Sequence, residues 1–285
     1  MKIFPTDFRR PVAAFTMVEI AICLAIIGIA LVGIIGVLPY GMNTQRDTRE
    51  ETLINQDVSV LLPMITQGMR GADDLTNYVY AITNYWTLYN ANGTTNGTVN
   101  TSGYTFNSTG GAPYPPYYSN VQLTNGANII GLLSTPEYVG APPYFNYPNC
   151  PAVPEVINGS GYQVYSNHIV AYIHAMSGLA SDKPPQDNTL MVNGAFSYRM
   201  LVVNAPVALS TNDFDAPYNQ QIWQNQRELR LTFLSPEQPN GTVGNNRLTF
   251  RATIAGQLLP SFLNNVNNES LYFYQPQSFN VNTND

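Results

Sequence analysis

The sequence predicts an α+β fold in which one long N-terminal helix packs on an antiparallel sheet formed by the C-terminal part of the chain. An uninterrupted apolar run from Ile20 to Leu38 is followed by a helical stripe of apolar residues that extends to Ile65. Two later segments, near residues 230 and 250, alternate between apolar and polar side chains. A period of 3.6 residues indicates a helix, and a period of two indicates a half-buried strand.

The apolar run is long enough to cross a bilayer, because about 20 apolar residues suffice for a spanning helix. A secretory signal peptide would have a shorter apolar stretch, followed by a small-residue cleavage site. Here Pro39-Tyr40-Gly41-Met42 follows the run, and Ala13-Ala14 precedes it. An ordinary single-pass anchor explains the run but not Glu19, because a carboxylate at the start of such a run is costly in lipid.

The residues before the run predict its orientation. Lys2, Arg9 and Arg10 are accompanied by one acid, Asp7. Basic flanking residues stay on the cytoplasmic side of a membrane. We therefore expect a single-pass protein whose large C-terminal part lies outside the inner membrane.

The helix is expected to continue as an amphipathic segment to about residue 70. Pro39 and Gly41 predict a kink or short break before it, because proline costs roughly 3 kcal/mol inside a helix. The apolar stripe of the resumed helix needs a sheet to cover it. Its members are Ile54, Val58, Leu61, Leu62 and Ile65, and the expected polar face carries Arg46, Glu50, Asn55 and Gln56.

Residues 71–195 are rich in Tyr, Asn, Gly and Pro, and their strand pairing cannot be derived from the pattern. Within and after this region, Tyr162–His174 and Phe196–Val203 are expected strands. The clearest strands lie further on, with a loop expected at Leu234–Asn246 between them. The first has Leu229, Leu231 and Phe233 alternating with Glu228, Arg230 and Thr232, and the second has Leu248, Phe250, Ala252 and Ile254 alternating with Arg247, Thr249, Arg251 and Thr253. Glu228 is expected to pair with Arg247 or Arg251, a contact worth well under about 1 kcal/mol if exposed.

The chain offers little material for catalysis, so we do not expect an enzyme. His168 and His174 are the only histidines, and in a strand six residues span roughly 20 Å, too far for one metal. Asp213 and Asp215 are the one weak calcium candidate, weighed against a solvated turn; otherwise no cofactor is expected. The chain has a net charge of −6, which argues against nucleic-acid binding, since that needs a basic face.

The start of the apolar run resembles the N-terminus of type IV prepilins and type II secretion pseudopilins. The residues that carry the resemblance are Ala14-Phe15-Thr16-Met17-Val18-Glu19, against a family consensus of Gly-Phe-Thr-Leu-Val/Ile-Glu. The resemblance implies cleavage between Ala14 and Phe15, methylation of the new N-terminus at Phe15, and a role in assembly for Glu19. Ala14 departs from the family, which usually has glycine there, and this puts the efficiency of cleavage in question.

A second stretch, Gly36 to Met42 with Arg46 shortly after, is similar to minor pseudopilin-like proteins of verrucomicrobial type. These proteins carry a Gly-x-Leu-Pro-x-Gly turn after the membrane helix, as Gly36-Val37-Leu38-Pro39-Tyr40-Gly41 does here. Together the two resemblances imply a pilin-like fold. They imply a cytoplasmic leader (1–14), a transmembrane helix (15–38), a kinked amphipathic extension (39–70), a variable region (71–195) and a C-terminal sheet region with its tail (196–285).

The resemblance implies a minor pilin or pseudopilin that assembles through its N-terminal helix into a pilus-like fibre or pseudopilus. The implied partners are other pilin or pseudopilin subunits, a prepilin peptidase and methyltransferase, and inner-membrane lipid. A different class remains open: a single-pass anchored envelope protein that does not polymerise and binds a ligand through its Tyr- and Asn-rich loops. The sequence does not identify the secretion, twitching, adhesion or DNA-uptake machine that such a subunit would join.

Overall fold

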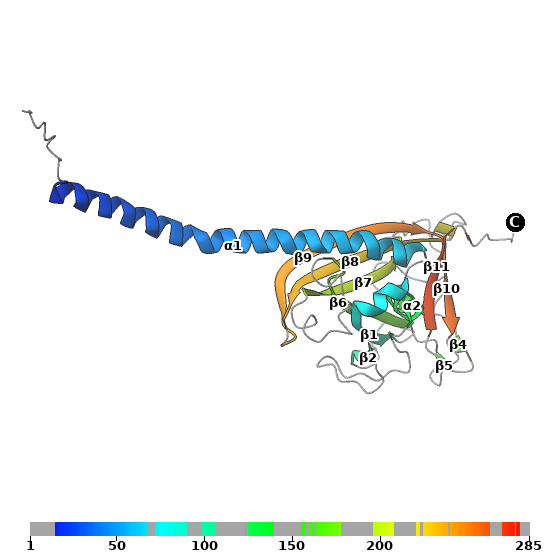
Figure 1. The fold of residues 1–285 in the computed structure, drawn as a ribbon. Helices are drawn as coiled ribbons and strands as arrows, with labels where there is room; N and C mark the ends of the chain where they lie inside the picture. Colours follow the sequence, from blue (N-terminus) through cyan, green and yellow to red (C-terminus); the bar gives the residue numbers. More distant parts are fainter. Residues whose placement is uncertain are drawn as a thin grey trace, which may run out of the picture. The chain divides into compact units, whose positions relative to one another are not determined.

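The computed structural model describes residues 15–67, 72–89, 98–105, 123, 125–139, 156–157, 160–161, 164–177, 196–207, 221–222, 225–238, 240–262, 270–276 and 278–279. The chain divides into two compact units, Met1–Arg49 and Glu50–Asp285, and each is described by itself. The described part of the first unit is helical, and the second unit contains the sheet (Figure 1). The α+β class expected from the sequence is therefore correct.

The N-terminal helix α1 runs from Met17 to Gln67 without interruption. The helix has no break at Pro39 and Gly41, because both residues lie inside α1, while the alternative of a kink stays a prediction. Proline lacks the N–H of one helical hydrogen bond, and its ring crowds the carbonyl four residues earlier, but the hydrogen bonds on either side can still form. Just beyond Pro39, the Thr44 hydroxyl donates to the Tyr40 carbonyl at 3.0 Å, which adds a polar contact to this turn. The cost of proline is local, and the long helix on either side outweighs it.

From Glu50 onward, one face of α1 is buried. The apolar stripe predicted from the helical period forms the centre of this face, and Asn55 and Gln56 are exposed as expected. Glu50 is the exception, because it was expected on the polar face and is only 5% exposed. Its carboxylate accepts a hydrogen bond from Asn246 Nδ2 at 3.2 Å. Glu50 lies one helical turn before Ile54, so it shares the buried face. The helical position of Glu50, and not its polar side chain, therefore determines the face on which it lies.

The second unit contains an antiparallel sheet of seven strands, counted over the described residues. Six of them follow the order β2-β1-β6-β7-β8-β9, and β3 pairs with β6 at one end. The strands of this sheet are β1 (Val79–Tyr89), β2 (Asn100–Thr105), β3 (Tyr138–Val139), β6 (Val164–His174), β7 (Ser197–Pro206), β8 (Gln226–Glu237) and β9 (Val243–Ala255). Two small hairpins pair β4 (Val156–Ile157) with β5 (Ser160–Gly161) and β10 (Gln257–Phe262) with β11 (Ser270–Gln275).

The strands expected from the sequence are present as β6, β7, β8 and β9. The sheet is nevertheless larger than predicted, because β1, β2 and β3 come from the region 71–195 and pair directly with the later strands. The division placed at residue 195 therefore runs through one sheet. The expected loop Leu234–Asn246 is also too long, since β8 continues to Glu237 and β9 begins at Val243.

The alternation of β8 and β9 places their apolar side chains on one face of the sheet. Leu229, Leu231 and Phe233 are fully buried, and the arginines and threonines of β9 are exposed. Glu228 lies 3.8 Å from Arg251 Nη1 and 3.3 Å from Arg230 Nη2. One of the two expected partners is thus correct. The register places the other candidate, Arg247, opposite Leu234, six positions away from Glu228.

Two short helices cover the same apolar face beside α1. They are η1 (Ala72–Asn77), a 3-10 helix, and α2 (Gly126–Leu133), which begins where the Asn125 side chain accepts a hydrogen bond from Ala127 N at 2.8 Å. After α2 the chain passes between the ends of β6 and β7. There Glu137 N donates to the Asn204 carbonyl at 2.8 Å, and Asn167 N donates to the Glu137 carbonyl at 2.7 Å. One core therefore joins α1, η1, α2 and the sheet.

A second buried carboxylate of α1, Asp57, makes more contacts with the sheet than Glu50 does. Asp57 is 1% exposed and lies within the apolar stripe. It accepts hydrogen bonds from Tyr198 OH on β7 at 2.8 Å and from Ser177 Oγ, just after β6, at 2.6 Å. The backbone N–H groups of Met176 and Ser177 donate to it at 3.1 Å each. Burial raises the pKa of Asp57, while the hydrogen bonds from these donors act to lower it.

Replacing Asp57 by alanine should destabilise the protein by about 3 kcal/mol, because buried donors would be left without their acceptor. The measurement is urea unfolding of the full chain in detergent, followed by circular dichroism. The matched control is Glu51→Ala, which removes an exposed acid from the same helix and should change the unfolding free energy by less than about 0.5 kcal/mol. Equal stability of the two variants would show that Asp57 does not hold α1 to the sheet.

Candidate functional site

The first turn of α1 carries two of the residues singled out from the sequence. Phe15 is 81% exposed and precedes the helix. Thr16 is the N-cap, and its backbone N–H and hydroxyl donate to Glu19 Oε2 at 2.8 and 2.9 Å. Glu19 N in turn donates to Thr16 Oγ1 at 3.3 Å. This reciprocal arrangement is a capping box, which satisfies backbone donors that a helix start leaves unpaired.

The capping box gives Glu19 a local role that the sequence interpretation missed. The signature Thr-x-x-Glu ahead of an apolar run was present in Thr16-Met17-Val18-Glu19 and is the known pattern for such a cap. A carboxylate at this position also interacts favourably with the positive end of the helix dipole. The hydrogen bonds from Thr16 use only one carboxylate oxygen, so Oε1 remains available for a partner outside this turn.

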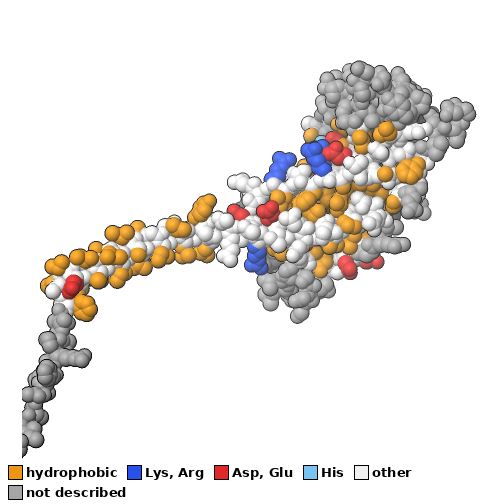
Figure 2. Space-filling model, turned by 90° about the horizontal axis from the view of Figure 1, so that it is seen from above, with side chains coloured by type: hydrophobic (Ala, Val, Ile, Leu, Met, Phe, Trp, Pro, Cys, Tyr) orange, Lys and Arg blue, Asp and Glu red, His pale blue; other side chains and the backbone are white. Residues whose placement is uncertain are grey.

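The helix residues that follow are exposed, and those from Ile20 to Leu38 are all apolar. Every residue from Phe15 to Arg49 is exposed, including Cys23 and the isoleucines and leucines of the run. One window of this helix reaches a mean hydropathy of 3.0, and none of it is buried. Apolar side chains accordingly cover the visible surface of this segment (Figure 2). The helix is long and apolar enough to cross a membrane once.

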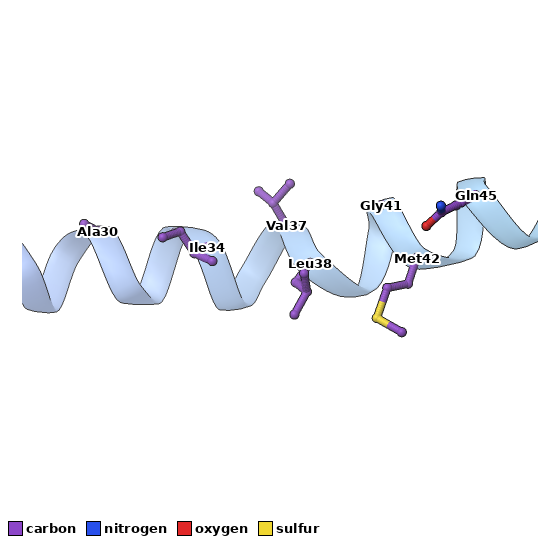
Figure 3. A pocket seen from close by; sticks show the side chains of 8 residues that line it. Ala30, Ile34, Val37, Leu38, Gly41, Met42 and Gln45 are labelled. Atoms are coloured by element: carbon purple, nitrogen blue, oxygen red, sulfur yellow. The ribbon is translucent and has the colours of Figure 1, made fainter.

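One side of this exposed helix carries a shallow groove. Its lining includes the small residues Ala30, Gly33 and Gly41. Val37, Leu38 and Met42 are among its larger side chains (Figure 3). A Cβ atom built on Gly33 or Gly41 would meet nothing within 4 Å. Small residues on a membrane helix let a second helix approach closely, so this side is suited to helix–helix packing.

A second cluster lies on the sheet face opposite α1. The Tyr80 ring stacks on His174, with centroids 4.5 Å apart, and its hydroxyl donates to Glu237 Oε2 at 2.8 Å. Arg199 Nε donates to Glu237 Oε1 at 3.0 Å, and Nη2 donates to the Gly241 carbonyl at 2.5 Å. The polar groups of this cluster satisfy one another. We therefore interpret it as a brace between β1 and β8 rather than as a reactive site.

The two histidines lie at different points of β6, as the sequence suggested. His168 is exposed, whereas His174 is 8% exposed and its Nδ1 lies 2.7 Å from Ser197 Oγ. Burial lowers the pKa of His174 to about 4. Across the described residues, no group of three or more His, Cys, Asp or Glu side chains could hold a metal ion. The calcium candidates Asp213 and Asp215, and Ala14 with the rest of the leader, lie outside the described residues.

Comparisons with protein-family models, with curated proteins and with solved structures find no match for this chain. The residues themselves therefore carry the functional argument. The structure brings Phe15, Thr16 and Glu19 together at one helix start, and it places Pro39 and Gly41 inside the helix that follows.

The low pKa of His174 predicts a loss of stability in acid. The folded-state pKa of about 4 lies below the ordinary histidine pKa of 6.5, so the unfolded chain binds the proton more readily. The contribution is fully present above pH 6.5 and is lost as the pH falls towards 4, by about 3 kcal/mol. It should appear as the difference in unfolding free energy between wild type and His174→Phe, measured from pH 7 to pH 4.

The comparison between the two proteins removes the contribution of Asp57, which has the opposite sign. Because its pKa is raised, Asp57 stabilises the folded state most at low pH, and this stabilisation is lost as the pH rises through the folded-state pKa. His174→Phe keeps a ring against Tyr80 but cannot titrate. Parallel pH profiles for wild type and variant would contradict a depressed pKa at His174.

Proposed function

We propose that this chain is a minor pilin or pseudopilin: a structural subunit that is anchored in the inner membrane and assembles through the first part of α1. The observation that carries the proposal is the contrast within one helix. From Glu50 to Gln67, α1 buries an apolar face in its own domain, whereas its apolar run from Ile20 to Leu38 is exposed on every side. Such a surface requires lipid or other helices around it.

The position of Glu19 supports assembly over simple anchoring. A carboxylate at the start of an apolar span is costly unless a cation compensates it. Glu19 has one oxygen committed to Thr16 and one available. In a helical stack of staggered subunits, the N-terminal amine of a processed neighbour would supply the cation. The amine of each subunit would then pair with Glu19 of the next subunit.

The local structure at Phe15 and Thr16 supports processing at this point. Both residues precede the helix, and Phe15 is exposed. A peptidase needs an accessible, non-helical peptide bond, and the Ala14–Phe15 bond lies just ahead of the helix start. Cleavage there would remove the basic leader and free the amine of Phe15 for methylation. The partners in this scheme are the peptidase and methyltransferase, other subunits and inner-membrane lipid, with the C-terminal domain on the extracytoplasmic side.

Substitutions of Glu19 separate its charge from its role in the cap. Glu19→Gln keeps an acceptor for Thr16 but removes the charge, so incorporation into fibres should fall at least tenfold while membrane insertion is unchanged. Glu19→Ala removes both the acceptor and the charge, so its incorporation into fibres should fall further. The measurement is quantitative immunoblotting of sheared fibres against the membrane fraction, in cells that carry the cognate assembly machine.

Two outcomes would contradict the proposal. Normal fibre incorporation of Glu19→Gln would show that the charge does not drive assembly, and would favour an anchored binding protein that does not polymerise. Mass spectrometry of the assembled subunit should find a methylated Phe15 at the N-terminus. An intact Met1 in that fraction would contradict processing before Phe15.

The groove on the exposed helix gives a second test of helix packing. Gly33→Leu should reduce fibre incorporation severalfold, because the larger side chain would hold a neighbouring helix away. It should not disturb the subunit itself, since nothing lies within 4 Å of the added Cβ and glycine is a poor helix former. Gly28→Leu, at another position with the same open space, is the control. Equal incorporation of both variants and wild type would exclude this groove as a contact.

A further inference from the structure

Strand β9 forms one edge of the seven-stranded sheet (Figure 1). It pairs with β8 on one side, and over the described residues no strand pairs with its other side. In an antiparallel ladder, every second residue directs its N–H and C=O away from the partner strand. The outer side of β9 therefore presents a row of backbone donors and acceptors to a further strand.

The length of β9 makes this edge unusual. It has 13 residues and no proline, and its register with β8 is continuous from Asn246 to Ala255. The opposite edge of the sheet is β2, which has only six residues. Natural sheets limit pairing at their edges with short strands, proline, bulges or charged side chains. Charge is the only one of these that β9 uses between Asn246 and Ala255, so its charges decide which strands it can accept.

The charged side chains of β9 lie on one face of the sheet. Thr249 Oγ1 lies 3.2 Å from Thr232 Oγ1, and Arg251 Nη1 lies 3.8 Å from Glu228 Oε1. Both β9 side chains therefore point to the same side, and the period of two adds Arg247 to it. All three are exposed, and the Arg251 side chain keeps 64% of its surface accessible.

This face of β9 has a positive charge that its own strands compensate only in part. Glu228 is shared between Arg230, at 3.3 Å, and Arg251, at 3.8 Å. Arg247 forms no ion pair within the part of the chain that the structure describes. A chain with a net charge of −6 thus presents a basic edge at this strand.

The other side-chain row of β9 is apolar and only partly covered. Leu248 and Phe250 are half-buried, and the Phe250 ring packs edge-on against Phe233 of β8. Side chains of neighbouring strands contact one another across the ladder. A further strand with apolar residues at alternate positions would therefore cover Leu248 and Phe250 on their open side.

We propose that the free edge of β9 binds an extended segment of another protein as an added strand, and that this segment alternates between polar, acidic residues and apolar ones. Carboxylates four residues apart would lie opposite Arg247 and Arg251, and the apolar residues between them would extend the core over Leu248 and Phe250. The backbone ladder would provide affinity, and the alternating side chains would provide specificity. The site lies within the second unit and does not involve the apolar run of α1, so its test does not depend on fibre formation.

A second copy of this chain fits the edge less well than an acidic partner does. Pairing of two β9 strands would bring two copies each of Arg247 and Arg251 onto one face, and like charges on neighbouring strands are destabilising. The arginines therefore oppose pairing between copies, which is a common use of charge on an edge strand. The same charges attract a strand that carries carboxylates.

The experiment titrates capped synthetic peptides into the full-length protein in an uncharged detergent, followed by calorimetry. The acidic peptide is Thr-Val-Glu-Val-Thr-Val-Glu-Val-Thr, and the basic peptide has lysine in place of glutamate. Wild type should bind the acidic peptide saturably and the basic peptide at least tenfold more weakly, because each charge would then face an arginine. Bound acidic peptide should also slow amide hydrogen exchange in β9, measured by mass spectrometry.

Two double variants test the arginines. Arg247→Glu with Arg251→Glu should reverse the preference, so that the basic peptide binds and the acidic one does not. Binding of the basic peptide would also show that this variant is folded. Arg247→Lys with Arg251→Lys is the matched control, since it keeps both charges and should bind the acidic peptide as wild type does.

A third peptide tests the added strand. Proline in place of the valines keeps both carboxylates but cannot donate to a ladder, so this peptide should not bind. Equal binding of the proline peptide would overturn the proposal, as would unchanged binding of the acidic peptide to the charge-reversed variant. Absence of saturable binding to wild type would also overturn it and would leave the arginines as charges that only prevent pairing. A concentration-dependent dimer of wild type that protects the β9 amides would assign the edge to a second copy instead.

Discussion

The placement of α1 on the sheet depends on one buried carboxylate. Apolar contacts alone are non-directional, so a stripe of Ile and Leu could pack on the sheet in more than one register. Asp57 accepts hydrogen bonds from residues 176 and 177 and from Tyr198, and these groups have fixed positions at the ends of β6 and β7. The Tyr198 ring then packs edge-on against Phe233, and Phe233 against Phe250. The helix is thereby fixed to β7 through Asp57 and to β9 through Glu50, and a row of rings connects Tyr198 to β8 and β9.

The same helix serves two different environments, and its composition changes accordingly. Before residue 50 its isoleucines and leucines are exposed, and after residue 50 residues of the same type are almost completely buried. The apolar side chains of the first segment are exposed, and an exposed apolar surface of this size is typical of contact with lipid or with other chains. A continuous helix through Pro39 is consistent with this division, because the two environments need no change of backbone conformation between them.

The sequence predicted those elements whose residues repeat with a clear period. The stripe from Ile54 to Ile65 and the alternation in β8 and β9 were found because apolar and polar positions follow one face each. Asp57 was missed because its donors lie about 120 residues away, and a local period cannot show them. Strand β1 lies between β2 and β6 with both faces partly covered, so it lacks the alternation that marks β9. The capping box at Thr16 and Glu19 was visible as a motif, but the sequence analysis considered only the charge of Glu19.

Two carboxylates in apolar surroundings differ in how many hydrogen bonds they receive from their own chain. Asp57 receives four hydrogen bonds from its own chain and has no capacity left for an outside partner. Glu19 receives two from Thr16, both on one oxygen, so its charge is only partly compensated. An uncompensated charge is unfavourable in low dielectric, so Glu19 would gain from a cationic partner, whereas Asp57 would not. Asp57 therefore serves the fold, and Glu19 closes the helix start and keeps one oxygen for the assembly contact that we propose.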